Sequence, residues 1–266
     1  MSDRVTVEID GGVADVRLTR AEKLNALDPA MFTALADAAR TLAGDRSLRA
    51  VVLSGEGRAF CAGLDFSSFS DLSAEDGPQR LLVREDGGPA NFAQNPSFLW
   101  TELPIPVIAA VHGACLGGGL QIALGADIRF VAPDAQLSVM EIKWGLVPDM
   151  AGTQALRHLV GLDVAKELTF TGRVVSGTRA VELGLATHVS DTPREDALAL
   201  AREISSKSPD AIRAGKRLLN ASRRLDLEAG LKLESELQAS LLGRPNQREA
   251  VYANLEQRVA EFQDPE

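Results

Sequence analysis

The sequence predicts an α/β fold with a strand-rich first part and a mostly helical C-terminal part. Residues 5–18 have the pattern of a β-hairpin, residues 28–54 that of a helix followed by a buried strand, and helical patterns dominate from Gly152 onward. A chain of 266 residues can form one large domain, or one domain with an appendage, around a core that needs no disulfide or metal. We expect residues 1–200 to form this core and residues 201–266 to form a helical region attached to it.

Local signals place the first elements. Apolar and polar residues alternate on both sides of an Asp10-Gly11-Gly12 turn, which predicts two paired strands. Asp28 is a suitable N-cap, Pro29 suits the first helical position, and apolar residues follow at helical spacing as far as Gly44. Residues 49–54 then form a short apolar run, which predicts a buried strand.

The middle and the end of the chain carry further patterns. Residues 67–96 are rich in turn-forming residues, which predicts an irregular surface segment. Ser208 and Pro209 signal the start of a helix, and apolar residues recur at every fourth position from Leu225 to Leu241. The remaining predictions are strands at 105–111, 127–132 and 137–140, and helices around 120–124 and over 248–262.

The composition excludes several classes of protein. Lys and Arg total 28 against 37 Asp and Glu, which gives a formal net charge of −9. Proteins that bind nucleic acid or anionic membranes depend on clustered Lys and Arg, so we expect neither partner. No leader or bilayer-spanning segment is visible, and Cys61 and Cys115 lack a metal-binding spacing. We therefore expect a cytoplasmic protein with two reduced, buried cysteines.

Two glycine turns, each after a predicted strand, are the strongest local features. Gly117-Gly118-Gly119 precedes a helical run, so a ligand could approach the backbone closely and meet unpaired N–H groups of the first helical turn. Gly63-Leu64 follows another strand. Two such turns could supply the N–H groups of an oxyanion hole, which stabilises an acyl oxygen that gains charge. The alternative for the glycine triplet is close packing of a helix on a strand.

Two carboxylates lie in an otherwise apolar stretch, Glu141 and Asp149. Burial among apolar residues would raise the pKa of either carboxyl, as a general acid or base near neutral pH requires. The alternatives are a solvated strand end for Glu141 and an N-cap for Asp149, at the start of the helix near Gly152.

Several segments together resemble the crotonase superfamily, the enoyl-CoA hydratase/isomerase family. The resemblance covers nearly the whole chain, and its residues are RAEKLNAL (20–27), AFCAGLD (59–65), PVIAAVHGACLGGG (106–119), GLVPDMAGTQALRHLVG (145–161) and SGTRAVELGLATHV (176–189). It implies a right-handed spiral of ββα units with a C-terminal helical trimerisation region, assembled as a trimer or hexamer. It also implies a coenzyme A thioester substrate, with no separate cofactor and no metal.

The resemblance assigns binding roles to particular residues. The oxyanion hole falls on the N–H groups of Leu64 and Gly118. The positions that line the family's coenzyme A channel are Lys23, Leu24, Ala26, Ala62 and Asp65.

The catalytic positions separate the subfamilies. Hydratases carry two glutamates, which match Gln121 and Glu141 here, and a glutamine cannot exchange a proton at neutral pH. Dienoyl-CoA isomerases carry an acid that matches Asp149, a glutamate that matches Glu141 and an aspartate at the position of Gln121. This chain has two of those three acids, and Gln121 departs from both subfamilies. The preferred interpretation is therefore an enoyl- or dienoyl-CoA isomerase that uses Glu141 and Asp149, with Gln121 as a positioning group.

The sequence leaves other functions open. They are enoyl-CoA hydration through Glu141, thioester hydrolysis, a catalytically silent CoA-binding protein, and an RNA-binding relative that the net charge disfavours. We interpret His112, His158 and His188 as packing or surface residues, because none has a partner at metal-binding spacing. Phe66 and Trp144 could line an acyl site, although core packing is the default for aromatic residues.

Overall fold

The computed structural model describes residues 3–67, 81–84 and 88–265. Its main sheet is mixed, with the strand order β1-β2-β3-β4-β6-β9. Strand β1 is antiparallel to β2, and the pairs from β2 to β9 are parallel. The strands are β1 (Val5–Asp10), β2 (Val13–Leu18), β3 (Ala50–Gly55), β4 (Val107–Val111), β6 (Ile128–Val131) and β9 (His188–Val189).

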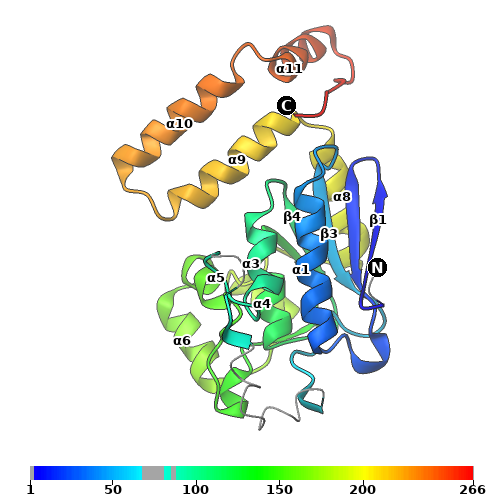
Figure 1. The fold of residues 1–266 in the computed structure, drawn as a ribbon, viewed down its shortest axis with the longest axis vertical. Helices are drawn as coiled ribbons and strands as arrows, with labels where there is room; N and C mark the ends of the chain where they lie inside the picture. Colours follow the sequence, from blue (N-terminus) through cyan, green and yellow to red (C-terminus); the bar gives the residue numbers. More distant parts are fainter. Residues whose placement is uncertain (1–2, 68–80, 85–87, 266) are drawn as a thin grey trace.

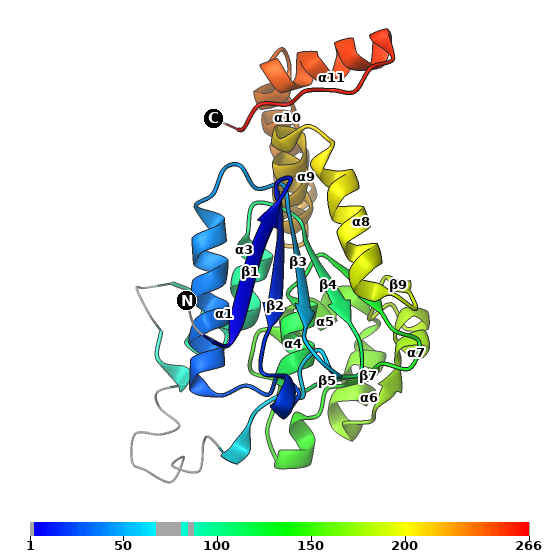
Figure 2. The same cartoon turned by 90° about the vertical axis from the view of Figure 1, so that its right-hand side faces the viewer.

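Both faces of the main sheet are covered, as parallel strands require. In β3, Val51 and Leu53 pack into the larger apolar cluster, whereas Ala50 and Val52 face a smaller cluster that includes Ala197. Figure 2 shows the helices on the two sides of the sheet, with α8 on the side opposite α1. The helices on the larger cluster are α1 (Pro29–Ala43), α3 (Asn95–Glu102) and α4 (Gly118–Leu124), and α8 spans Pro193–Ser205.

A small second sheet lies next to the start of α4. It has the order β5-β7-β8, with β5 (Ala114–Leu116) parallel to β7 (Gln136–Ser138) and β7 antiparallel to β8 (Val175–Ser176). Strand β5 leads into α4, and β7 is followed by a 3-10 turn, η3 (Glu141–Trp144). Helices α5 (Gly152–Leu159), α6 (Leu162–Thr171) and α7 (Gly177–Glu182) continue the chain from there.

The last helices form an arm that extends away from the sheet (Figure 1). Its members are α9 (Pro209–Ser222), α10 (Leu227–Leu241) and α11 (Pro245–Glu256). Lys216 attaches α9 to the body, since its buried ammonium group lies 2.7 Å from Asp127 Oδ2 and donates to Ile105 O at 2.9 Å. Within the described ranges, no helix is long and apolar enough to cross a membrane.

Most of the predicted elements are confirmed. The hairpin is present, and the Asp28 side chain caps α1 by accepting from Met31 N–H at 2.8 Å. Ser208 caps α9, and both cysteines are free and buried. Burial raises the pKa of the Cys61 thiol to about 12, which keeps the thiol protonated.

The terminal helix is shorter than predicted, and the irregular segment is only partly described. The terminal helix was expected over 248–262, but α11 ends at Glu256 because Gln257 adopts a left-handed conformation with φ 54° and stops the helical hydrogen bonding. Much of the irregular segment expected at 67–96 lies outside the described residues, and helix α3 begins at its end.

Helix α4 approaches the segment before Gly63 so closely that a side chain has no room at Gly119. A Cβ atom built on Gly119 would lie 2.3 Å from Cys61 O and 2.8 Å from Cys61 Cβ. The first of these neighbours is backbone, which cannot move aside as the end of a flexible side chain can. Gly119 therefore sets the distance between α4 and the segment that contains Leu64.

We expect Gly119→Ala to lower the free energy of unfolding by about 1–3 kcal/mol, because it overpacks a rigid contact. The measurement is chemical denaturation. Gly230→Ala is the matched control, since a Cβ there meets no atom within 4 Å and alanine favours helix α10 by up to about 1 kcal/mol. Equal stability of the Gly119→Ala variant and the wild type would contradict this account of the contact.

Candidate active site

The first candidate donor is the Leu64 N–H. It belongs to the segment 61–65, which runs between strand β5 and residues 24–27. On one side, the N–H and C=O of Cys61 are hydrogen bonded to β5. On the other side, the N–H groups of Ala62 and Asp65 both donate to carbonyls of residues 24–27, at 2.9 Å each.

The conformation of Gly63 determines where the Leu64 N–H points. In a regular extended chain, successive N–H groups alternate sides, so residues 62 and 65 would face opposite ways. Gly63 has φ +87°, and this left-handed residue brings both N–H groups to the same side. The Leu64 N–H is thereby directed away from residues 24–27, toward the side on which β5 leads to Gly118.

The second candidate donor is the N–H of Gly118, the first residue of α4. Gly117 precedes it with φ 50° and ψ −120°, a conformation that favours glycine. A Cβ on Gly63 would lie 3.8 Å from Gly118 N, so the two turns are neighbours. Neither the Leu64 N–H nor the Gly118 N–H donates to an acceptor within the described part of the chain.

Gln121 lies one turn into α4 and joins three segments through its buried amide. Its Nε2 donates to Glu141 Oε1 at 2.6 Å. Its Oε1 accepts from the N–H groups of Met150 and Gly152, at 2.8 and 3.0 Å. The carbonyl oxygen therefore uses both of its lone pairs, and one amide hydrogen remains for another partner.

Glu141 is buried, with 8% of its surface exposed. The alternative that it is a solvated strand end is therefore wrong. Burial is the main cause that raises the pKa of its carboxyl, the negative charge of Asp149 raises it further, and the Gln121 hydrogen bond opposes both. Its Oε2 is buried and has no hydrogen-bond partner among the described residues. A Cβ on Gly117 would lie 3.4 Å from Glu141 Oε1, which puts this carboxyl beside the turn that precedes the Gly118 N–H.

Asp149 does not cap a helix, so that alternative is also wrong. Helix α5 begins at Gly152, and its N-cap residue is Ala151, which makes no side-chain cap. Although the Asp149 residue is exposed, the protein around its carboxyl removes enough water to raise the pKa. Asp149 and Glu141 are thus two neighbouring carboxyls that both hold a proton more strongly than usual.

The residues predicted to line a coenzyme A channel lie on two paired segments. Lys23 is exposed at the end of a short 3-10 turn, Leu24 and Ala26 are partly exposed, and Ala62 pairs with Leu24 through its N–H. Asp65 differs, because its side chain is 9% exposed and lies 2.8 Å from Arg20 Nη2 in a buried ion pair.

Phe66 and Trp144 are not core residues, contrary to the default interpretation. They are 37% and 52% exposed, and their ring centroids lie 4.1 Å apart. Phe66 follows Leu64 by two residues and Trp144 ends the 3-10 turn that begins at Glu141. The aromatic pair therefore connects the two segments that carry a candidate donor and a candidate acid.

The histidines lie apart from this site, and no cluster of three or more metal-ligating side chains occurs in the described ranges. Sequence reasoning missed Arg20, which is 8% exposed and joins three segments. It also missed the N–H groups of Met150 and Gly152 as partners of Gln121. A backbone N–H group can belong to almost any residue type, so the sequence does not indicate these two partners. For Arg20, the only signal in the sequence is that two Asp residues, Asp28 and Asp65, follow it.

Comparisons with known proteins agree with this architecture. The profile of the family described as enoyl-CoA hydratase/isomerase matches residues 8–265. The mitochondrial methylglutaconyl-CoA hydratase of Mus musculus is 33% identical, with 96% of this chain and 81% of that protein covered. The human mitochondrial enoyl-CoA hydratase domain-containing protein 2 is 34% identical, with 95% and 86% covered.

A solved structure gives the same result for the fold. The crystal structure of an enoyl-CoA hydratase from Bacillus anthracis superposes with a TM-score of 0.91 at 29% identity, over 98% of this chain and 100% of that one. The expected α/β crotonase fold is therefore confirmed. The chain belongs to the enoyl-CoA hydratase/isomerase family.

Proposed function

We propose that the protein is an enoyl- or dienoyl-CoA isomerase, which moves a carbon–carbon double bond along an acyl chain held as a coenzyme A thioester. The observation that carries this proposal is the engagement of Gln121. Its carbonyl is already saturated by two N–H groups, and its amide holds Glu141. The groups left to move protons are the free Oε2 of Glu141 and the neighbouring Asp149.

In the proposed reaction, the thioester oxygen accepts hydrogen bonds from the N–H groups of Leu64 and Gly118. Glu141 removes a proton from the carbon nearest the thioester, and the electron pair left on that carbon delocalises onto the oxygen as an enolate or dienolate. The two N–H groups stabilise this charge. Asp149 delivers a proton to the distal carbon, so the double bond shifts and no atom is gained. At this point Glu141 holds the proton that it removed and Asp149 is a carboxylate, so one proton must pass from Glu141 to Asp149, through water at the exposed Asp149, before the next turnover.

The coenzyme A part of the substrate is proposed to lie along the paired segments that contain Lys23, Leu24, Ala26 and Ala62. Asp65 is assigned to the same region, with its side chain acting through Arg20 rather than on the substrate. Glu141 and Asp149 are the catalytic residues of this proposal, and Gln121 is a positioning residue.

Enoyl-CoA hydration is the second candidate. The specific observation in its favour is that the relatives and the solved structure described above are named hydratases. In that reaction Glu141 would activate water alone or with Asp149, because the Gln121 carbonyl has no lone pair left to accept from water.

We expect Glu141→Gln and Asp149→Asn each to lower isomerase turnover by about 10²–10⁴-fold, the usual contribution of a positioned acid or base. A panel of enoyl- and dienoyl-CoA thioesters, followed by mass spectrometry and ultraviolet absorbance, checks this result. Isomerisation leaves the mass unchanged, whereas hydration adds one water.

Gln121→Glu is the matched variant for the second candidate. It restores the pair of glutamates found in hydratases, so it should raise any hydration. If wild-type protein hydrates crotonyl-CoA efficiently and Asp149→Asn leaves the double-bond shift untouched, isomerisation is wrong and hydration replaces it.

The dependence of activity on pH should reflect the titration of the two neighbouring carboxyls. Glu141 must be deprotonated to act as a base, so activity should fall as the pH drops through a pKa higher than that of an ordinary glutamate. Asp149 must stay protonated to act as the acid, so activity should also fall as the pH rises and the second carboxyl ionises. In Asp149→Asn the residual activity should lose this alkaline limb, which the profile of kcat/KM against pH measures. Asp191→Asn removes one charge elsewhere on the surface and should leave the limb in place.

We also propose that the protein assembles as a trimer or hexamer through its C-terminal arm. Leu227, Leu231 and Leu255 of α10 and α11 are 79%, 53% and 76% exposed, so the arm has apolar surface that a second copy could bury. A groove of about 1380 Å³, lined by residues of α3, α5, α9 and α10, lies between the arm and the body. Light scattering should return the mass of a trimer or hexamer, and a monomer mass at all working concentrations would contradict the proposal.

A further inference from the structure

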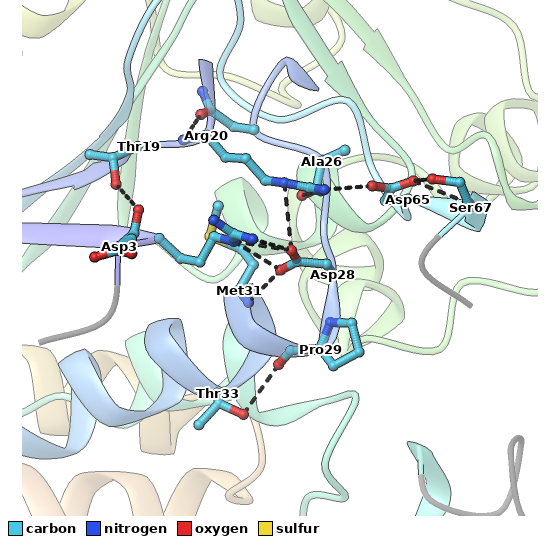
Figure 3. A network of polar contacts seen from close by, with 12 residues as sticks. Asp3, Thr19, Arg20, Ala26, Asp28, Pro29, Met31, Thr33, Asp65 and Ser67 are labelled. Carbon is cyan, nitrogen blue, oxygen red and sulfur yellow. Dashed lines mark hydrogen bonds and ion pairs between the residues drawn. The ribbon is translucent and has the colours of Figure 1, made fainter. Parts of the chain in front are cut away.

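Arg20 is a buried cation at the centre of a polar network that Figure 3 shows. Its Nη2 lies 2.8 Å from Asp65 Oδ2, and its Nη1 donates to Ala26 O at 3.0 Å. Its Nε lies 3.5 Å from Asp28 Oδ2, the carboxyl that caps α1 and also pairs with Arg4. The guanidinium thus connects the start of α1, the segment around Ala26 and the residue that follows Leu64.

The contacts of Arg20 enclose the backbone pairing that surrounds Leu64. The N–H of Leu27 donates to Gly63 O at 2.8 Å, and the N–H of Asp65 donates to Leu27 O at 2.9 Å. Arg20 holds the side chain of Asp65 on one strand of this pairing and the carbonyl of Ala26 on the other. Asp65 is further held through Oδ1, which accepts from the N–H and the hydroxyl of Ser67.

The Leu64 peptide needs such support, because Gly63 has many accessible conformations. Glycine populates positive and negative φ about equally, so the left-handed φ of +87° is not fixed by the residue itself. Two backbone hydrogen bonds to Leu27 hold this turn, and the side chain of Asp65 adds an anchor to a buried cation. A buried charge pair fixes geometry strongly, since either ion left alone in the interior is costly.

We propose that the Arg20–Asp65 ion pair positions the Leu64 N–H for the thioester oxygen. Both residues are positioning residues, because they act through the backbone and not on the substrate. The inference rests on the proposed binding of an acyl-CoA thioester between Leu64 and Gly118, and it holds for isomerisation and hydration alike. It predicts that loss of the pair weakens polarisation of the thioester carbonyl more than it weakens binding of coenzyme A.

The test measures this polarisation directly. The probe is butyryl-CoA with ¹³C at the thioester carbonyl, which has no double bond to shift or hydrate. Infrared difference spectra of the bound probe report the carbonyl stretch, which moves to lower frequency when N–H groups polarise the oxygen. In Asp65→Asn we expect this shift to shrink and kcat to fall about tenfold or more, which is part of the loss seen when an oxyanion-hole donor is removed. The affinity for free coenzyme A should stay nearly unchanged.

Arg4→Gln is the matched control. It removes the ion pair and hydrogen bonds to Asp28 in the same network, and these contacts do not involve the segment 62–65. It should reduce stability and leave the carbonyl frequency at the wild-type value. The double variant Arg20→Gln/Asp65→Asn removes both charges, so it should regain part of the stability lost in Asp65→Asn without regaining the carbonyl shift.

The outcomes separate the inference from the proposed function. If wild-type protein binds butyryl-CoA without a carbonyl shift, the oxyanion hole itself is contradicted. If the wild type shows the shift and folded Asp65→Asn shows the same shift and kcat, the positioning role is overturned while the proposed function stands. The positioning role would also be overturned if the carbonyl shift fell in proportion to the loss of stability in all three variants, Asp65→Asn, Arg4→Gln and the double variant. The network would then support the fold without positioning the Leu64 N–H.

Discussion

The structure of the site depends on the close contact between the first turn of α4 and the segment 61–64. A Cβ on Gly119 would collide with Cys61. A Cβ on Gly63 would lie only 2.7 Å from Leu116 O. A Cβ built on Gly118 would likewise lie 2.7 Å from Met150 Sδ and close to the side chain of Leu27. Because backbone meets backbone here, the turns that carry the N–H groups of Leu64 and Gly118 lie next to each other. Side chains at these positions would separate the turns by the width of a methyl group or more.

The same contact determines what α4 can do further along. Once its first turn is fixed, Gln121 follows on the buried side and reaches both Glu141 and the turn at Met150 and Gly152. The backbone N–H groups at 150 and 152 hold the amide oxygen, so the amide nitrogen must face Glu141. The orientation of one carboxamide therefore decides that Oε1 of Glu141 accepts a hydrogen bond while Oε2 has no partner among the described residues. The donors and the acid form one unit that is built around α4.

Local signals in the sequence predict the helices and strands well. They predict contacts between distant residues poorly. The hairpin and the cap at Asp28 depend on neighbours in the chain, which is why turn and cap patterns identify them. The glycine turns indicate that something approaches the backbone, but not that Gly119 meets Cys61. Phe66 and Trp144 were assigned to the core by default, and only the folded chain brings them together at the site. Arg20 has no local pattern, since its partner Asp65 is distant in sequence.

The glutamine at position 121 changes the electrostatics of the two acids at positions 141 and 149. Gln121 Nε2 lies 2.6 Å from Glu141 Oε1, and two carboxylates at that distance could not both be ionised in a buried site. A glutamate there would share one proton with Glu141, and Asp149 would add a third acid to a region where burial already raises both pKa values. With glutamine in place, the site holds two titratable acids rather than three. One acid is buried and held by an amide, whose hydrogen bond favours the carboxylate and opposes the effect of burial, and the other is open to water. When the pair holds one proton, one member is a base and the other an acid, which is the state that the proposed isomerisation requires.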